Sequence, residues 1–132
     1  MKRRQFLKLS GAAAVSALSI SKVSAQASAW PNKPVRLVLP YAPGGATDLI
    51  GRPWADKLSQ AFGHPFVIDN RGGAGGMIGT EAVAKAPADG YTFLLTPNGP
   101  LTVLPSLRQL PYDAQKDFTP VGRVGDLVCG FV

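Results

Sequence analysis

The sequence alternates apolar runs, glycine-rich loops and helix-like segments, and this order constrains the fold more than any other feature. Residues 35–39 form an apolar run typical of a strand, followed by a loop at 40–46. Residues 65–69 form a second such run, followed by a loop at 70–76, and residues 91–96 a third run. With a helix expected after each loop, this order predicts an α/β fold with a parallel-stranded sheet flanked by helices.

The first predicted helix has recognisable ends. Thr47 or Asp48 can cap its start, and Gly63 is expected to end it. Pro53 would remove a backbone hydrogen bond if it lay deeper than the first turn. The regular helix is therefore expected either to begin near Arg52 or to have a loosened first turn. Its apolar residues recur at steps of four and three and are expected to be buried: Ile50, Trp54, Leu58 and Ala61.

The remaining pattern is shorter and weaker. A second helix is expected over residues 77–85, a third over 101–107, and an irregular stretch at 110–113. A further apolar run covers residues 121–132, and the chain is expected to be cut short within it. Cys129 lies in this run and is expected to be a small buried hydrophobe, because the chain has no second cysteine for a disulfide.

Residues 1–27 resemble a secretory signal peptide. Positive residues precede the mildly apolar stretch at 9–20, and small residues follow it. As a helix, that stretch would rise about 18 Å, which is too short for stable membrane insertion across a core of about 30 Å. The paired Arg3 and Arg4 resemble the twin-arginine export motif, with general secretion as the alternative route. Cleavage is expected after Ala25 or Ala27, and the alternative reading is a frayed amphipathic helix.

Charge and residue pairing exclude several functions. The whole chain carries a formal charge of +6, but the signal-like segment holds five basic residues and no acidic one. From residue 28 onward the net charge is +1, so no basic stripe for nucleic acid is expected. His64 has no second ligand at metal-binding spacing, and no nucleophile and base can be paired. No metal, cofactor or catalytic residue is therefore expected, and His64 reads as a solvated turn residue.

Both glycine-rich loops follow a strand and precede a helix. In an open α/β sheet, ligands bind outside the carboxyl ends of the strands. Glycine allows a ligand to approach the backbone closely, and the first amides of the next helix lack helical partners. Neither loop matches the phosphate-loop or dinucleotide-loop pattern. Two such loops at one crevice predict an anion site, whereas the alternative is that the glycines serve only tight turns and helix packing.

Four segments carry a resemblance to a known family: residues 40–48, 69–79, 84–92 and 110–113. They read PYAPGGATD, DNRGGAGGMIG, AKAPADGYT and LPYD. In this order and spacing they resemble the Bug-type receptors of tripartite tricarboxylate transporters. The resemblance covers residues 30–132, nearly everything after the signal-like segment.

The resemblance implies a periplasmic solute-binding protein that closes on a small carboxylated ligand and delivers it to membrane permease subunits. Residues 28–132 would form the first lobe of a two-lobed, type II periplasmic-binding-protein-like fold, with the second lobe missing. Backbone amides and small hydroxyl side chains would hold the carboxylate. Carried onto this sequence, the implied ligand-binding residues are Ala42, Gly44, Gly45, Thr47, Asp48, Ala74, Gly75, Gly76, Met77, Thr96, Asn98 and, more weakly, Gly99.

Two other functions remain open at this point. One is an exported α/β enzyme acting on a small anionic substrate, and the other is a receptor that reports ligand to a sensor kinase without transport. The binding reading is favoured because the loops are rich in donors and no catalytic group can be assembled. The sequence does not name the ligand.

Overall fold

A computed structural model describes residues 30–126 of the 132-residue chain. The signal-like segment, Cys129 and the end of the last apolar run lie outside the described residues.

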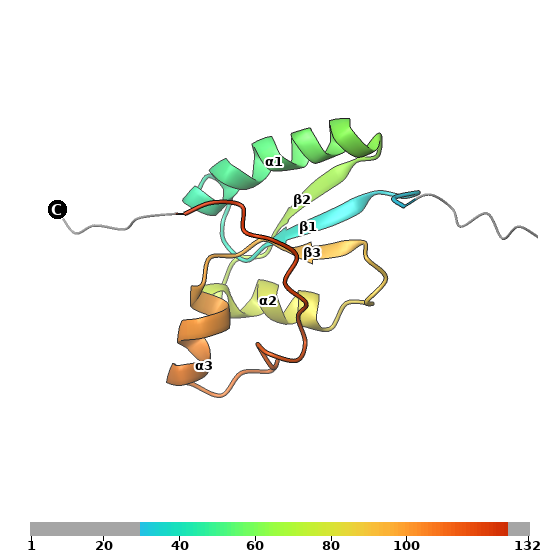
Figure 1. The fold of residues 1–132 in the computed structure, drawn as a ribbon. Coiled ribbons are helices and arrows are strands. Elements are labelled where there is room, and N and C mark those ends of the chain that lie inside the picture. Colours follow the sequence, from blue (N-terminus) through green and yellow to red (C-terminus); the bar gives the residue numbers. More distant parts are fainter. Residues whose placement is uncertain (1–29, 127–132) are drawn as a thin grey trace, which may run out of the picture.

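The centre of the fold is a three-stranded sheet in which every strand runs parallel to its neighbour (Figure 1). The strands are β1 (Val35–Leu39), β2 (Phe66–Asn70) and β3 (Thr92–Leu94), in the order β2-β1-β3. The predicted α/β fold with a parallel sheet is confirmed. The third strand is shorter than predicted, although Arg36 N–H still bonds the Tyr91 carbonyl and Leu95 N–H the Val38 carbonyl.

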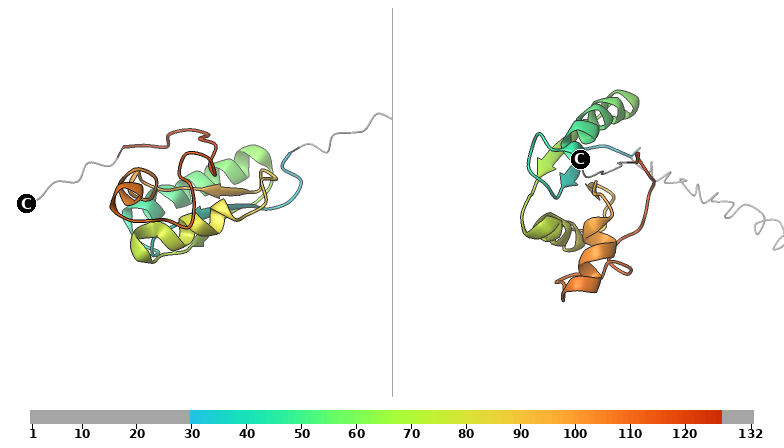
Figure 2. Two further views of the ribbon diagram at one scale, coloured as in Figure 1. Left: turned by 90° about the horizontal axis from the view of Figure 1, so that it is seen from below. Right: turned by 90° about the vertical axis from the view of Figure 1, so that its left-hand side faces the viewer.

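Two helices cover opposite faces of the sheet, as Figures 1 and 2 show. They are α1 (Ala46–Phe62) and α2 (Met77–Ala84). Gly63 ends α1 in the left-handed conformation, as predicted, and its N–H bonds the Ser59 carbonyl at 3.0 Å. Of the two alternatives expected from Pro53, a start of α1 near Arg52 is wrong: the helix begins at Ala46 and contains Pro53 in its interior. The other alternative, a loosened first turn, stays a prediction.

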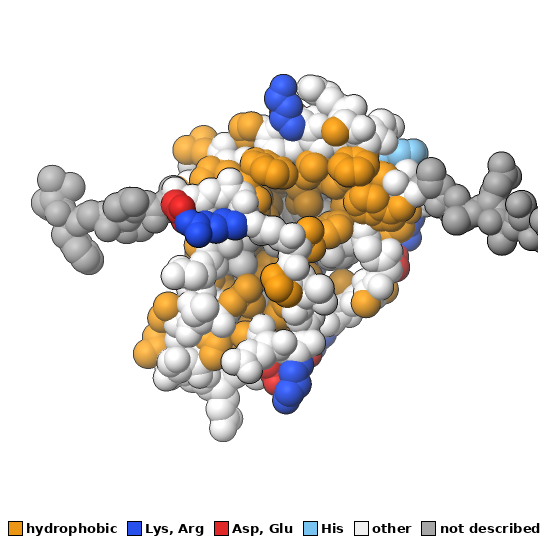
Figure 3. All heavy atoms as spheres, viewed as in Figure 1, with side chains coloured by type: hydrophobic (Ala, Val, Ile, Leu, Met, Phe, Trp, Pro, Cys, Tyr) orange, Lys and Arg blue, Asp and Glu red, His pale blue; other side chains and the backbone are white. Residues whose placement is uncertain are grey.

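The buried side of α1 differs from the predicted stripe. Gly51 and Ala55 are buried in α1, whereas Trp54 is 43% exposed and Ala61 is exposed. The large apolar residues instead line an open groove of about 450 Å³ on this side of the sheet. Figure 3 shows apolar side chains gathered across this face of the molecule. The groove is lined by Trp30, Leu37, Trp54, Leu58, Phe62, Phe66, Phe93–Leu95 and Val121–Val124.

Small residues bring both helices close to β1. A Cβ added at Gly51 of α1 would lie 2.9 Å from Leu39 Cδ2, at the tip of a buried side chain. A Cβ at Gly79 of α2 would lie 2.6 Å from the Arg71 carbonyl oxygen and 2.7 Å from Pro40 Cα. Because Val35, Val38 and Leu39 are fully buried, β1 forms the core of the domain.

The chain after β3 is largely irregular. The helix predicted over 101–107 is present as a π-helical turn, Gly99–Val103, followed by α3 (Leu104–Leu107). Residues 108–126 form turns and extended chain, including the predicted irregular stretch at 110–113. Within residues 30–126, no helix is both long and apolar enough to span a membrane.

The glycine contacts generate a prediction about stability. Replacing Gly79 by Ala should gain up to about 1 kcal/mol in helix propensity but lose more through overpacking, which typically costs about 1–3 kcal/mol. Gly51→Ala is the matched comparison. It brings the same gain in helix propensity, but the added Cβ would meet the tips of side chains and not backbone atoms. Denaturant unfolding should therefore rank Gly79→Ala as less stable than Gly51→Ala. A Gly79→Ala chain more stable than the parent would contradict this packing argument.

Candidate functional site

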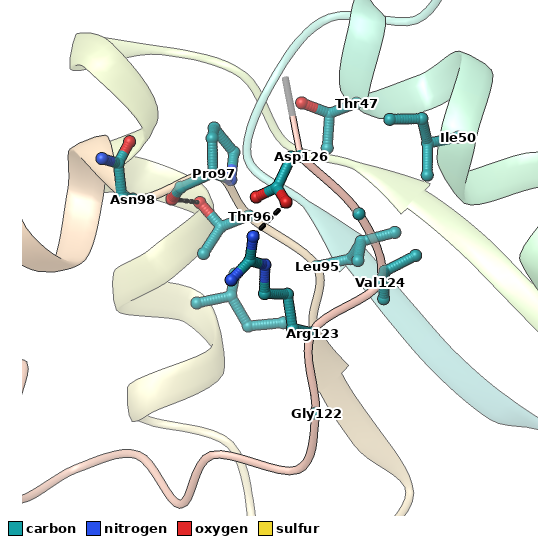
Figure 4. Close-up of a pocket in the computed structure, with 12 residues that line it drawn as sticks. Thr47, Ile50, Leu95, Thr96, Pro97, Asn98, Gly122, Arg123, Val124 and Asp126 are labelled. Carbon is teal, nitrogen blue, oxygen red and sulfur yellow. Dashed lines mark hydrogen bonds and ion pairs between the residues drawn. The ribbon is translucent and has the colours of Figure 1, made fainter. Parts of the chain in front are cut away.

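The loops that follow the three strands leave the same edge of the sheet, because the strands are parallel. A pocket of about 440 Å³ lies at this edge, beside the start of α1 and the end of β3 (Figure 4). Its lining combines hydroxyl, amide, apolar and charged side chains. The lining residues are Thr47, Ile50, Leu94, Leu95, Thr96, Pro97, Asn98, Gly122, Arg123, Val124, Gly125 and Asp126.

The charged groups of the pocket come from the segment after residue 121. Arg123 and Asp126 form an ion pair, and Figure 4 shows their side chains pointing toward one another. Both side chains are largely exposed, so solvent screens their attraction. The Thr96 hydroxyl donates to the Pro97 carbonyl at 3.0 Å, which orients it within the loop after β3. The pocket therefore offers an ion pair, hydroxyl groups and an apolar wall to a small ligand.

The first loop, residues 40–45, leads into the amino end of α1. Gly45 is the N-cap, and the first helical bond runs from Leu49 N–H to the Gly45 carbonyl at 3.0 Å. The amides that precede Leu49 in this turn have no helical partner and carry a partial positive charge. Gly44 has a φ of 83°, and a Cβ there would meet nothing within 4 Å. This loop thus presents its backbone to open space, where an anion can approach.

Asp48 lies beneath this loop and is only 3% exposed. Its Oδ2 accepts hydrogen bonds from Gly44 N–H at 2.9 Å and from Arg52 Nε at 2.8 Å. Its Oδ1 accepts from Asn70 Nδ2 at 3.1 Å. The Arg52 hydrogen bond is the largest of the effects that lower the pKa of Asp48 to about 2, followed by the Gly44 amide. The carboxylate is therefore ionised throughout the neutral range.

The expectation that Thr47 or Asp48 caps the first helix is wrong. Gly45 occupies the N-cap position and makes no side-chain cap bond. Asp48 is the third residue of α1, and its side chain turns back to the amide of Gly44. Asp48 thereby stabilises the loop ahead of the helix and also lies close to the positive end of the helix dipole.

The second loop, residues 71–76, packs against the first loop through Tyr41. Gly76 is buried with a φ of 95°, and a Cβ there would lie 2.7 Å from Pro100 Cγ and 3.2 Å from Tyr41 Oη. The Tyr41 hydroxyl donates to the Gly75 carbonyl at 3.4 Å, and burial raises the pKa of Tyr41. Gly76 is therefore required for close packing between the loops, in addition to any contact with a ligand.

The structure separates the site residues that the resemblance implied into three groups. Thr47, Thr96 and Asn98 line the pocket, and the backbone of Asn98 also accepts hydrogen bonds from Leu101 and Thr102. Two other groups lie outside the pocket lining. One of them is exposed and comprises Ala42, Gly44, Gly45, Ala74 and Gly75, and the other is buried or half-buried and comprises Asp48, Gly76, Met77 and Gly99.

Several residues that shape the site were missed by the sequence reasoning. The spacing of Asp48 and Arg52 is a helical i, i+4 pair and could have indicated their contact. Asn70 and Tyr41 carry no such local signal, because their contacts span 22 to 34 positions of sequence. Arg123 lies in a segment without regular structure, where no periodicity predicts its direction.

The described part of the chain contains no group of three or more His, Cys, Asp or Glu residues that could hold a metal ion. His64 is half-buried in the turn after α1, directly after Gly63. It takes no part in the pocket lining.

Comparisons of this chain with a family profile and with individual proteins point to the same family. The profile of the tripartite tricarboxylate transporter family receptor matches residues 50–132. Protein BugT of Bordetella pertussis is 45% identical over 103 residues, which cover 76% of this chain and 32% of BugT. The chain thus spans about a third of the length of the curated relatives it matches.

Two solved structures are similar in both fold and sequence. MatC from Rhodopseudomonas palustris, solved with bound malate, is 37% identical with a TM-score of 0.66. That alignment covers 69% of this chain and 31% of MatC. A protein solved as a periplasmic transporter is 43% identical with a TM-score of 0.63, covering 65% of this chain and 29% of the other.

The contacts of Asp48 generate a prediction about pH. The folded pKa of about 2 lies below the ordinary value of 3.8, so Asp48 stabilises the fold fully above pH 4. This contribution is lost as the pH falls from about 4 to about 2. The free energy of unfolding of Asp48→Asn should therefore depend less steeply on pH in that window than that of the parent chain. Equal slopes in denaturant titrations at pH 4, 3 and 2 would contradict the prediction; Asp56→Asn, an exposed change on the same helix, is the control.

Proposed function

The chain belongs to the tripartite tricarboxylate transporter receptor family, and on this premise we propose that it forms a ligand-binding lobe of a solute-binding receptor for small carboxylates. The arrangement of the first loop, the start of α1 and the pocket carries the proposal. Unpaired helix amides, an open glycine backbone and the Arg123–Asp126 ion pair lie at the carboxyl edge of one parallel sheet. The amide donors suit the negative charge of a small anion, and the apolar wall of the pocket suits the carbon atoms of that anion.

Carboxylates are favoured over phosphates as ligands. MatC, which is similar in fold and sequence, was solved with malate bound. The first and second loops of this chain, PYAPGGATD and NRGGAGGM, contain no lysine, whereas a phosphate loop requires a lysine beside its glycines. We propose that the backbone N–H groups of Gly45, Ala46 and Thr47, with the Thr47 hydroxyl and the Asn98 amide, bind one carboxylate. The Thr96 hydroxyl would turn from the Pro97 carbonyl to donate to the same carboxylate. Residues 74–76 of the second loop, with Met77, would contact the ligand from the same edge of the sheet.

The proposed cellular location and partners of this lobe are those that membership of the family implies. The receptor would work in the periplasm, as a protein solved as a periplasmic transporter is 43% identical to this chain. Residues 28–132 would form the first of two lobes that close on the ligand, after removal of residues 1–27. The loaded receptor would then dock on membrane permease subunits. This role requires no catalytic group and no cofactor.

Calorimetric titration of the two-lobed receptor that contains this chain tests the proposal. Malate and succinate should bind, while succinamide, which has the same shape without charge, should bind at least about tenfold more weakly, a difference of about 1.4 kcal/mol. The 132-residue chain alone should bind more weakly than the two-lobed receptor, because one wall would be absent.

Inorganic phosphate and acetate are the control ligands for this titration. Phosphate should bind poorly, since the loops lack a lysine, and acetate should reveal how much a single carboxylate contributes. Binding of succinamide as tight as that of succinate would contradict carboxylate recognition. Binding of phosphate alone would indicate a different class of ligand.

A further inference from the structure

Asp48 and Asn70 join the two glycine-rich loops by hydrogen bonds. The side-chain amide of Asn70, at the end of β2, donates to Asp48 Oδ1 at 3.1 Å and to the Tyr41 carbonyl at 3.2 Å. Both acceptors are oxygens, so the group that faces them must be the NH₂ of Asn70. Asn70 precedes the second loop directly, whereas Tyr41 and Gly44 belong to the first loop. The pair therefore connects the backbone of the first loop to the start of the second.

The side chain of Tyr41 continues this connection. Its backbone carbonyl is held by Asn70, while its hydroxyl donates to the Gly75 carbonyl and lies beside Gly76. A shift of the Tyr41 backbone would carry the ring with it, and Gly76 has no spare room between that ring and Pro100. Asp48 is thus connected to the backbone of the second loop through Asn70 and Tyr41.

Asp48 cannot serve as a direct partner for an anionic ligand. Its carboxylate is negatively charged, and the residue is 3% exposed. Both of its oxygens already accept hydrogen bonds, from Gly44, Arg52 and Asn70. Any effect of Asp48 on ligand affinity must therefore act through the loop that it holds.

We propose that Asp48 and Asn70 form a positioning pair, which sets the first loop relative to the second and supports ligand affinity without contacting the ligand. This inference rests on the proposed function for its effect on binding. An asparagine at position 48 cannot replace the aspartate: if its oxygen faces Gly44 and Arg52, its NH₂ faces the NH₂ of Asn70. In the opposite orientation, its NH₂ faces the two donors Gly44 N–H and Arg52 Nε–H.

Two variants of the partners separate positioning from general stabilisation of the carboxylate. Asn70→Ala removes the bond that joins the loops but leaves the Gly44 and Arg52 bonds of Asp48. Arg52→Gln removes the charged partner, which is 55% exposed, but leaves both bonds to the loops. If Asp48 acts only as a buried charge that needs neutralising, Arg52→Gln should be the more harmful change. If it positions the loops, Asn70→Ala should be the more harmful.

The experiment measures malate affinity by calorimetry in the two-lobed receptor, at a temperature where circular dichroism shows each variant folded. We expect Asn70→Ala and Asp48→Asn to weaken malate binding about tenfold or more, since hydrogen bonds to charged groups are worth about that factor. Arg52→Gln should weaken binding less than about threefold, and Asp56→Asn should leave it unchanged. Arg52→Gln as harmful as Asn70→Ala would overturn the proposal.

A second measurement needs no ligand. In amide proton–nitrogen NMR spectra of the free protein, Asn70→Ala and Asp48→Asn should shift the signals of Gly75 and Gly76, whereas Arg52→Gln should leave them in place. Unmoved signals in both loop variants would overturn the positioning pair, whatever the binding data show. If the parent receptor binds no carboxylate, the proposed function fails, and these signals alone decide the inference.

Discussion

Close approach of both helices to the central strand is the constraint on which the rest of the structure depends. β1 is buried on both faces, and the space above and below it is set by Gly51 of α1 and Gly79 of α2. With a larger residue at Gly79, α2 would have to move away from the backbone of Pro40 and Arg71, whereas at Gly51 the tips of the neighbouring side chains could shift instead. Gly79 packs against Pro40 and Arg71, the residues at which the two glycine-rich loops begin, so the packing of α2 helps to position both loops.

The glycines of the two loops have different physical roles, although their sequences look alike. Gly44 adopts a positive φ and faces open space, so it exposes backbone. Gly76 also adopts a positive φ but is enclosed by Pro100 and the Tyr41 ring, so it permits packing. A glycine-rich motif therefore does not by itself identify the residues that touch a ligand. What distinguishes the two loops is their surroundings, and Gly76 is enclosed by Tyr41 and Pro100, which lie 35 and 24 positions away in the sequence.

Much of the fold could be predicted from the sequence, because strands and helices leave local patterns. The runs at Val35–Leu39 and Phe66–Asn70, and the stop at Gly63, depend on neighbours within a few positions. The helix start and its buried stripe were predicted less well, since Pro53 is accommodated inside α1 and Gly51, not Trp54, faces the sheet. In the site, Thr47, Thr96 and Asn98, which the family resemblance implied, line the pocket, whereas the roles of Asn70 and Tyr41 depend on contacts between distant segments. Such contacts have no periodicity for a sequence to reveal.

The two ends of the strands carry different kinds of residue. At the amino ends of the strands, the Trp30 ring packs edge-on against Phe62, Phe66 and Phe93, with centroids 5.3 to 6.4 Å apart. Its indole N–H also bonds the Gly90 carbonyl at 3.1 Å. The glycine-rich loops lie at the other edge. With Trp54, the other tryptophan of the chain, replaced by phenylalanine, Trp30 becomes an optical probe of this end of the domain. Its fluorescence should follow the loss of the aromatic cluster on unfolding, while events at the loops reach it only through the length of the sheet.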